Sequence, residues 1–355
     1  MQPIVGPNIM SATAPKFSGF RDADAQEPGI PMRTADKKYQ YVRDPQFEEI
    51  VEDARAKTFT IEGYYPAEDR MRWNWDSDIH ANLRAQVDAM PQEEFLERAQ
   101  FALPALTSLR ENKTLNNDQV DVIKALEDGK FKPTRQNIET LKQALVRAQL
   151  RGLNSMANHA LTAEEPSVAP LSFGIQKYSR RTDVRDAFHN FSGDEAKHTH
   201  ILMRYVEKLQ EDRQVSPRVE KMFGVFSTLA KVSPAAAIFL ALNVEAQGGA
   251  YFQFMGENAP DPLYRGICKA IYELDEARHV KVMVELYNML YRGASPFEKL
   301  RNKALMKFML KEGKKQDLYP YMTNACYAFG VDPKKMQDHR NKLVGDAFAQ
   351  IGYDL

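Results

Sequence analysis

Residues 275–279 read Asp275-Glu276-Ala277-Arg278-His279, and residues 194–198 repeat the pattern as Asp194-Glu195-Ala196-Lys197-His198. Each copy contains Glu-x-x-His, and residues three apart on an α-helix are neighbours on one face. Each copy therefore places a carboxylate beside an imidazole, which together can bind one metal ion. Two such pairs on facing helices can bind two ions if two further helices each supply a carboxylate.

Upstream glutamates occur at matching distances from the two motifs. Glu245 lies 31 residues before Glu276, and Glu164 lies 31 residues before Glu195. Glu165 is an alternative to Glu164 with a spacing of 30, but Glu164 keeps both halves of the repeat equal. A single Glu-x-x-His is ordinary decoration of a surface helix. Two copies with matched upstream carboxylates favour a metal site instead.

Composition narrows the class of protein. The 355 residues contain 48 Lys+Arg and 48 Asp+Glu, so the chain has no net charge. Its overall charge therefore gives no reason to expect nucleic-acid binding. Cys268 and Cys326 are too few for a disulfide framework, and the N-terminus has no signal-peptide pattern. No apolar run reaches the roughly 20 residues of a membrane span. We therefore expect a soluble, cytoplasmic protein without a membrane span and without a nucleic-acid partner.

The pattern of apolar residues predicts an all-α protein. Residues 1–40 are rich in Pro, Gly and Ala and are expected to form a largely irregular N-terminal arm. Residues 41–355 are expected to form a single helical domain with a metal-binding four-helix core at about 135–292, and no strand signal competes. Apolar periodicity predicts helices over 76–89, 91–110, 117–128, 135–164, 263–291, 317–329 and 333–349. Start signals, in several cases with Pro at the first helical position, predict further helices that begin at about 183, 217, 234 and 296.

Glu245 stands out because its helix is apolar nearly all round. A helix of that kind is buried on every side, and a lone buried carboxylate is costly unless it is paired, protonated or bound to a metal. Gly248 and Gly249 follow at once. Glycine inside a helix costs about 0.5–1 kcal/mol, so this pair indicates that a neighbouring helix or a small ligand approaches closely.

With these motifs placed on four helices, the sequence resembles the ferritin-like di-iron carboxylate proteins over roughly residues 135–292. The oxygen-activating branch is most similar, with its ribonucleotide reductase small subunits, bacterial multicomponent monooxygenases, acyl carrier protein desaturases and arylamine N-oxygenases. The resemblance implies a ferritin-like four-helix bundle core with additional flanking helices. Pro166 departs from the family's pattern. The metal ligands that the resemblance implies are Glu164, Glu195, His198, Glu245, Glu276 and His279.

The resemblance also implies roles for the charged residues inside the motifs. In the family an aspartate at the positions of Asp194 and Asp275 accepts the free N–H of a ligand imidazole and fixes its tautomer. Lys197 and Arg278 are expected to neutralise these aspartates. The remaining histidines of this region, His159, His189 and His200, are expected to be ordinary core or surface residues. Phe252, Phe254 and Tyr272 are candidate pocket walls, with plain aromatic packing as the alternative.

The expected cofactor is two Fe ions, with Mn also compatible, and the expected co-substrate is O2. The implied activity is oxidation of a small-molecule or carrier-bound organic substrate by hydroxylation, N-oxygenation or desaturation, with no catalytic side chain beyond the metal ligands. A separate electron donor is expected because the chain has no flavin, nicotinamide or iron–sulfur motif, and a homodimer is an expected assembly. The alternatives are a ferritin-like metal-handling protein and a non-catalytic bundle subunit.

Overall fold

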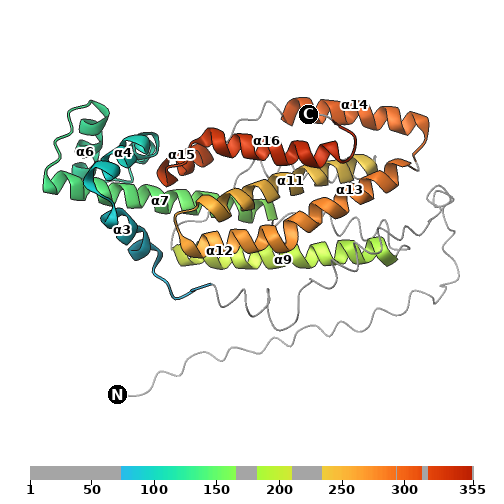
Figure 1. The fold of residues 1–355 in the computed structure, drawn as a ribbon, viewed down its shortest axis with the longest axis horizontal. Helices are drawn as coiled ribbons and strands as arrows, with labels where there is room; N and C mark the ends of the chain where they lie inside the picture. The colour runs from blue at the N-terminus through green and yellow to red at the C-terminus, as the bar shows by residue number, and fades with distance from the viewer. Residues whose placement is uncertain (1–72, 165–181, 210–233, 293, 314–318, 354–355) are drawn as a thin grey trace, which may run out of the picture. The chain divides into compact units, whose positions relative to one another are not determined.

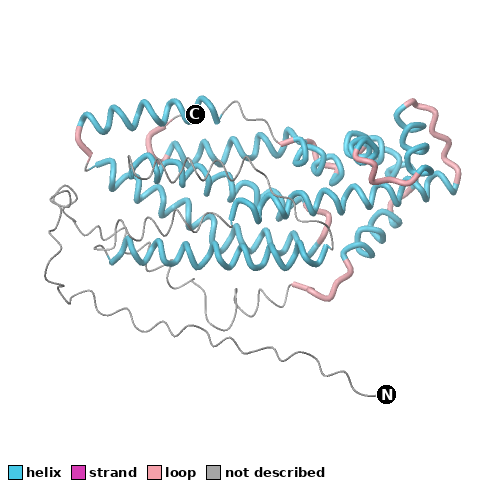
Figure 2. Tube along the Cα trace, turned by 180° about the vertical axis from the view of Figure 1, so that it is seen from behind, coloured by secondary structure: helices cyan, strands magenta, loops and turns pink. Residues whose placement is uncertain are grey.

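The computed structural model describes residues 73–164, 182–209, 234–292, 294–313 and 319–353. Every regular element in these ranges is a helix, and Figure 2 accordingly shows helices and loops without a strand in the described chain. This confirms the all-α prediction for these residues. None of the described helices combines the length and apolar character that a membrane crossing demands. The predicted arm of residues 1–40 and the predicted helix start at Ser216-Pro217 lie outside the described ranges.

The first described helices are short and pack at one end of the long ones (Figure 1). They are α3 (Ile79–Ala89), α4 (Gln92–Phe101), α5 (Leu103–Glu111) and α6 (Asn117–Glu127). The prediction of one helix over 91–110 is wrong, because the chain breaks at Ala102 into α4 and α5. Pro104 in the first turn of α5 has no N–H to donate, and its ring crowds the preceding turn.

Four long helical segments carry all the predicted metal ligands. They are α7 (Arg135–Glu164), α9 (Thr182–Leu209), α11 (Pro234–Asn258) and a fourth segment of three consecutive elements. The fourth segment comprises α12 (Pro262–Ile271), the π-helical turn η2 (Tyr272–Glu276) and α13 (Ala277–Arg292). Helix α7 packs against α9, α11 packs against α12 and α13, and α9 contacts α12, so two helix pairs face each other (Figure 1).

The π-helical turn corrects the prediction of a continuous helix over 263–291. A π-turn accommodates one extra residue within a helix and therefore changes the direction of the side chains that follow it. Asp275 and Glu276 lie inside this turn and are buried, whereas Ala277 directly after it is exposed. The turn thus sets which face of the segment the second motif presents to the interior.

The remaining helices cover the bundle. Helix α14 (Pro296–Gly313) contacts α11, α15 (Pro320–Phe329) packs along α7, and α16 (Pro333–Ala349) packs along α11. Trp73 is buried in the hydrophobic core and lies against Gly266 of α12. Cys268 and Cys326 are buried free thiols, in agreement with the absence of a disulfide framework. Helix α11 is thereby enclosed by several neighbours, which explains why it is apolar nearly all round.

Candidate metal centre

The six predicted ligands come from all four long segments. Glu164 ends α7, Glu195 and His198 lie on α9, and Glu245 lies in the middle of α11. Glu276 is the last residue of η2, and His279 follows in the first turn of α13. All six side chains are buried, with no more than 8% of any of these residues exposed. The structure therefore brings together residues that are up to 115 positions apart in the sequence.

Their ligand atoms form two overlapping groups of four. One group contains Glu164, Glu195, His198 and Glu276, and the other contains Glu195, Glu245, Glu276 and His279. Within each group the carboxylate oxygens and imidazole nitrogens lie within 4.8 Å of one another, so each group could hold a metal ion. Glu195 and Glu276 belong to both groups. The arrangement is therefore two adjacent candidate metal positions that share two carboxylates.

The two halves of the centre are nearly equivalent in geometry. Nδ1 of His198 lies 3.1 Å from Oε2 of Glu164, and Nδ1 of His279 lies 3.1 Å from Oε2 of Glu245. In each pair the glutamate precedes the histidine by 34 residues. Both imidazoles therefore present Nδ1 to the carboxylates, which leaves Nε2 to face the opposite side.

At Nε2 each imidazole meets an aspartate from the other motif. Nε2 of His198 lies 3.0 Å from Oδ2 of Asp275, and Nε2 of His279 lies 3.2 Å from Oδ2 of Asp194. With Nε2 protonated, each imidazole donates to its aspartate and leaves Nδ1 free to coordinate a metal. The aspartates thus cross between α9 and the fourth segment, a pairing that the sequence pattern alone does not specify.

Two cations compensate the buried aspartates. Nζ of Lys197 lies 3.0 Å from Asp194 and 2.6 Å from Asp275, and the guanidinium of Arg278 is paired with both aspartates as well. Lys197 and both aspartates are almost completely buried. Buried charges are tolerated only when they are paired and hydrogen-bonded. This four-charge network, defined as Asp194, Lys197, Asp275 and Arg278, fixes the orientation of both imidazoles.

The carboxyl groups of the centre favour the protonated form when no cation is bound. Burial, together with the charge of Glu195, raises the pKa of Glu164 well above its usual value, and burial with the charge of Glu245 does the same for Glu276. Burial also raises the pKa of Glu245. Glu195 differs: burial opposes its ionisation, but a hydrogen bond with Glu164 and the nearby imidazoles of His198 and His279 outweigh burial and lower its pKa to about 2. Four carboxyl groups gathered this closely require positive charge among them.

The imidazoles take up that positive charge in the absence of metal. Burial works against protonation, but hydrogen bonds to Asp275 and Asp194 raise the pKa values of His198 and His279, respectively, well above the usual value. Burial likewise opposes ionisation of the two aspartates, yet the same hydrogen bonds hold their pKa values low. The centre is thus electrostatically arranged for cations.

One carboxylate oxygen allows a test of whether the residues present fit a metal ion. Oε2 of Glu195 is buried and has no hydrogen-bond partner among the described residues; its neighbour Nδ1 of His198 lies 3.8 Å away. A buried carboxylate oxygen without a partner is costly. A cation coordinated at this shared residue would satisfy it, and a set of carboxylate and imidazole donors suits Fe(II), Mn(II) or a similar divalent ion.

The glycines of α11 lie against the second motif. A Cβ atom added at Gly248 would lie 3.5 Å from Oε2 of Glu276. A Cβ atom added at Gly249 would lie 3.6 Å from the Cβ of Glu276 and 3.7 Å from the ring of Tyr272. The close approach indicated by the two glycines is therefore that of the neighbouring segment carrying Glu276. The ring of Phe252, one turn further along α11, lies 6.2 Å from the ring of His198.

The other histidines, the three aromatic residues and Glu165 named in the sequence analysis are not members of the two ligand groups. His189 and His200 are exposed, and His159 packs among tyrosines. Of the three candidate pocket walls, Phe252 and Phe254 are buried and Tyr272 is half-buried. Glu165 lies outside the described residues, whereas Glu164 is within ligand distance of its group.

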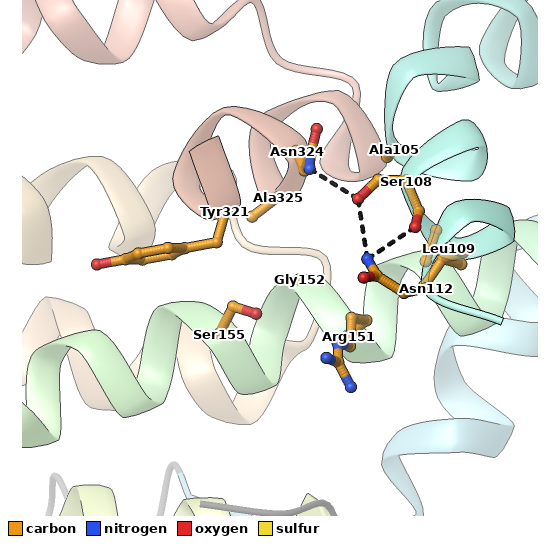
Figure 3. A pocket seen from close by; sticks show the side chains of 11 residues that line it. Ala105, Ser108, Leu109, Asn112, Arg151, Gly152, Ser155, Tyr321, Asn324 and Ala325 are labelled. Atoms are coloured by element: carbon orange, nitrogen blue, oxygen red, sulfur yellow. Dashed lines mark hydrogen bonds between the residues drawn. The ribbon is translucent and has the colours of Figure 1, made fainter. Parts of the chain in front are cut away.

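A cavity of about 120 Å³ lies away from these ligands, between α5, α7 and α15 (Figure 3). Ser108 on its wall accepts a hydrogen bond from Asn324 at 3.1 Å, and Asn112 donates to the carbonyl of Ser108 at 2.8 Å. None of the six predicted ligands lines this cavity. It is therefore a feature separate from the candidate metal centre.

Comparison of the chain with protein-family models, with curated proteins and with solved structures gives no match in any of the three. The residues themselves define the class: an all-helical protein with a buried cluster of glutamate and histidine side chains that could hold metal ions.

Proposed function

We propose that α7, α9, α11 and the α12–α13 segment form a ferritin-like four-helix core that binds two metal ions side by side. The observation that carries this proposal is that two four-residue ligand groups share Glu195 and Glu276. A single-metal site would need only one of these groups. A purely structural charge cluster would leave no reason for the partnerless oxygen of Glu195.

The metal that fits best is iron, with Mn(II) as the close competitor. Four carboxylates and two imidazoles form a hard-to-borderline ligand set. The four negative charges cancel two dications, so the loaded site becomes neutral and its burial ceases to be costly. The crossed aspartates hold both histidines in the tautomer that coordinates through Nδ1.

The activity we assign to this centre is O2-dependent oxidation of an organic substrate. Fe(II) held by the two ligand groups would supply the electrons for the reduction of O2. The residues of this chain hold the ligands in place, exclude water from a buried site and keep the imidazoles oriented. Hydroxylation, N-oxygenation and desaturation share one ligand set, and the substrate is an organic molecule, free or attached to a carrier. The electrons are replaced by a separate donor.

Anaerobic Fe(II) titration of the full chain, followed by exposure to O2, tests the proposal. The expected result is saturation at two Fe(II) per chain, then O2 consumption with a change in the absorbance of the iron. Glu245→Gln should lower the stoichiometry, whereas Glu257→Gln, at an exposed position on the same helix, should leave it unchanged.

Three results would contradict the proposal. They are no Fe(II) uptake, uptake that is the same in Glu245→Gln, and bound Fe(II) that O2 leaves unoxidised. Continued uptake far beyond two ions per chain would instead support a metal-storage function.

A further inference from the structure

A continuous series of aromatic rings leads from the candidate metal centre to α15. It begins at His198 on α9, passes through two residues of α11 and one of α7, and ends at the start of α15. The separations between successive ring centres are 6.2, 5.2, 5.8, 5.8 and 5.3 Å. The rings in order are those of His198, Phe252, Tyr251, His159, Tyr321 and Tyr319. We call this series the aromatic relay.

One step of the aromatic relay is a hydrogen-bonded tyrosine–histidine pair. The hydroxyl oxygen of Tyr321 lies 2.8 Å from Nδ1 of His159. Burial lowers the pKa of His159 to about 4, so the imidazole is neutral near pH 7. With its own proton on Nε2, the imidazole accepts the phenolic hydrogen at Nδ1. His159 is thus placed as a base for Tyr321.

Tyr251 has a different environment. Its hydroxyl donates to the carbonyl of Met156 at 2.7 Å and lies 2.6 Å from the hydroxyl of Tyr264. Neither partner is a base near pH 7, since burial also raises the pKa of Tyr264 well above its usual value. Loss of an electron from a phenol is favourable only when its proton can leave as well. Tyr251 is therefore not oxidised itself and serves only as part of a tunnelling path for an electron, whereas Tyr321 can hold a neutral radical.

We propose that Tyr321, with His159 as its proton acceptor, is the terminal electron donor of the aromatic relay and reduces the oxidised metal centre when no substrate is bound. This inference rests on the proposed function, because the oxidant is the O2-oxidised metal centre. Tyr321 loses one electron, which tunnels past the rings of Tyr251 and Phe252 without oxidising them and would lower one bound metal ion by one oxidation level. The phenolic proton moves to Nδ1 of His159. The products are a neutral Tyr321 radical and a protonated His159.

The end point lies where a reductant can reach it. Tyr319 and Tyr321 are half-buried, in contrast to Phe252 and Tyr251, which are buried. Tyr321 also lines the cavity between α5, α7 and α15 (Figure 3). A small external reductant can therefore restore the tyrosine without entering the buried centre, which keeps oxidising equivalents away from the ligands.

The first experiment is independent of metal. Metal-free full-length protein is oxidised with photogenerated tris(bipyridine)ruthenium(III) and frozen, and the tyrosyl radical is measured by electron paramagnetic resonance. Tyr321→Phe keeps the stacked ring and His159→Gln keeps a polar side chain. Each is expected to lose most of the signal. Tyr327→Phe, on the same helix but outside the relay, is the matched control and should retain it. Equal signals in all four proteins would overturn the proposal.

The second experiment uses iron-loaded protein exposed to O2 without substrate, with iron oxidation followed separately by absorbance. The same radical should appear after the iron is oxidised. Phe252→Leu should diminish it here while leaving the photo-oxidation signal intact, because only the connection to the metal is interrupted. Iron that O2 fails to oxidise would refute the proposed function. If O2 oxidises the iron but neither Tyr321→Phe nor Phe252→Leu changes the radical signal, the aromatic relay is refuted and the proposed function is not.

Discussion

Asp194 and His279 are 85 residues apart in the sequence, yet Oδ2 of the aspartate lies 3.2 Å from Nε2 of the imidazole. The equivalent contact joins Asp275 to His198 at 3.0 Å. Each Asp-Glu-x-x-His motif therefore supplies a histidine to one ligand group, a glutamate to both groups and an aspartate to the histidine of the other motif. The two motifs hold each other in place, and this has measurable consequences.

Replacing Asp194 with Asn should weaken metal binding more at the position that contains His279 than at the one that contains His198. Loss of a carboxylate behind a ligand histidine typically costs 10–100-fold in metal affinity. Competition between Fe(II) or Mn(II) and a chelator of known affinity measures the change. Asp346→Asn, at an exposed position on α16, is the control. Unchanged affinity in Asp194→Asn would show that the crossed contact does not orient the ligand.

Replacing the buried Lys197 with Met should destabilise the fold. The substitution leaves Asp194 and Asp275 with one cation instead of two, and breaking a buried ion pair from one side costs about 3–5 kcal/mol. The free energy of unfolding in urea measures this loss, and Lys197→Arg should recover part of it. The outcome that contradicts the argument is a Lys197→Met protein as stable as the original chain.

Replacing a carboxylate ligand by its amide should change metal binding differently for a ligand shared by both groups and for a ligand of one group. Glu195→Gln removes a ligand from both groups and should weaken both metal positions, whereas Glu164→Gln removes a ligand from only one. Calorimetric titration with Mn(II) should therefore show two weakened sites for the first variant and one for the second. The same binding profile for both variants would mean that the ions do not share Glu195.

Side-chain size at Gly248 should control the position of Glu276. A Cβ there makes an ordinary contact of 3.5 Å with Oε2, so Gly248→Ala should keep metal binding and stabilise the helix by about 0.5–1 kcal/mol. Gly248→Val adds two methyl groups that must displace the carboxylate, and metal affinity should fall. Thermal unfolding and metal titration of both variants test this. Equal affinity in the two would show that Glu276 has room to move.

His159 should make the metal-free protein less stable as the pH falls. Its pKa is near 6.5 in the unfolded chain and about 4 in the folded one, because burial disfavours the charged form. Between these values only the unfolded chain binds the proton. The free energy of unfolding therefore decreases from about pH 6.5 down to about pH 4, by at most ~1.4 kcal/mol per pH unit. Above pH 6.5 this residue contributes no pH dependence.

The difference between wild type and His159→Gln in urea unfolding at pH 7 and pH 5 isolates this contribution. The rings that surround His159 are those of Tyr251, Tyr319 and Tyr321. The variant should lose less stability between the two pH values than wild type. His189→Gln, at an exposed position, is the matched control. A variant with the same pH sensitivity as wild type would contradict the argument.

The sequence predicts most of the helices and the convergence of the ligands because both depend on local periodicity. The spacing of 31 residues selected Glu164 and Glu245, and the structure brings both to the centre. The π-turn at Tyr272–Glu276 was not predicted, since a single extra residue in a helix leaves no mark on the apolar pattern. The crossing of Asp194 and Asp275 was not predicted either, because it depends on how two helices pack rather than on either one alone.

The near-equivalence of the two halves means that either half could be completed by a second copy of itself. One helical hairpin, α7 with α9, already contains a terminal glutamate, a shared glutamate, a histidine and an aspartate for its partner. Such a hairpin associated with an identical copy about a two-fold axis would assemble the whole ligand set. Two such hairpins joined in tandem would supply the same ligand set within one chain, and each half could then differ locally, as the second half does at its π-turn.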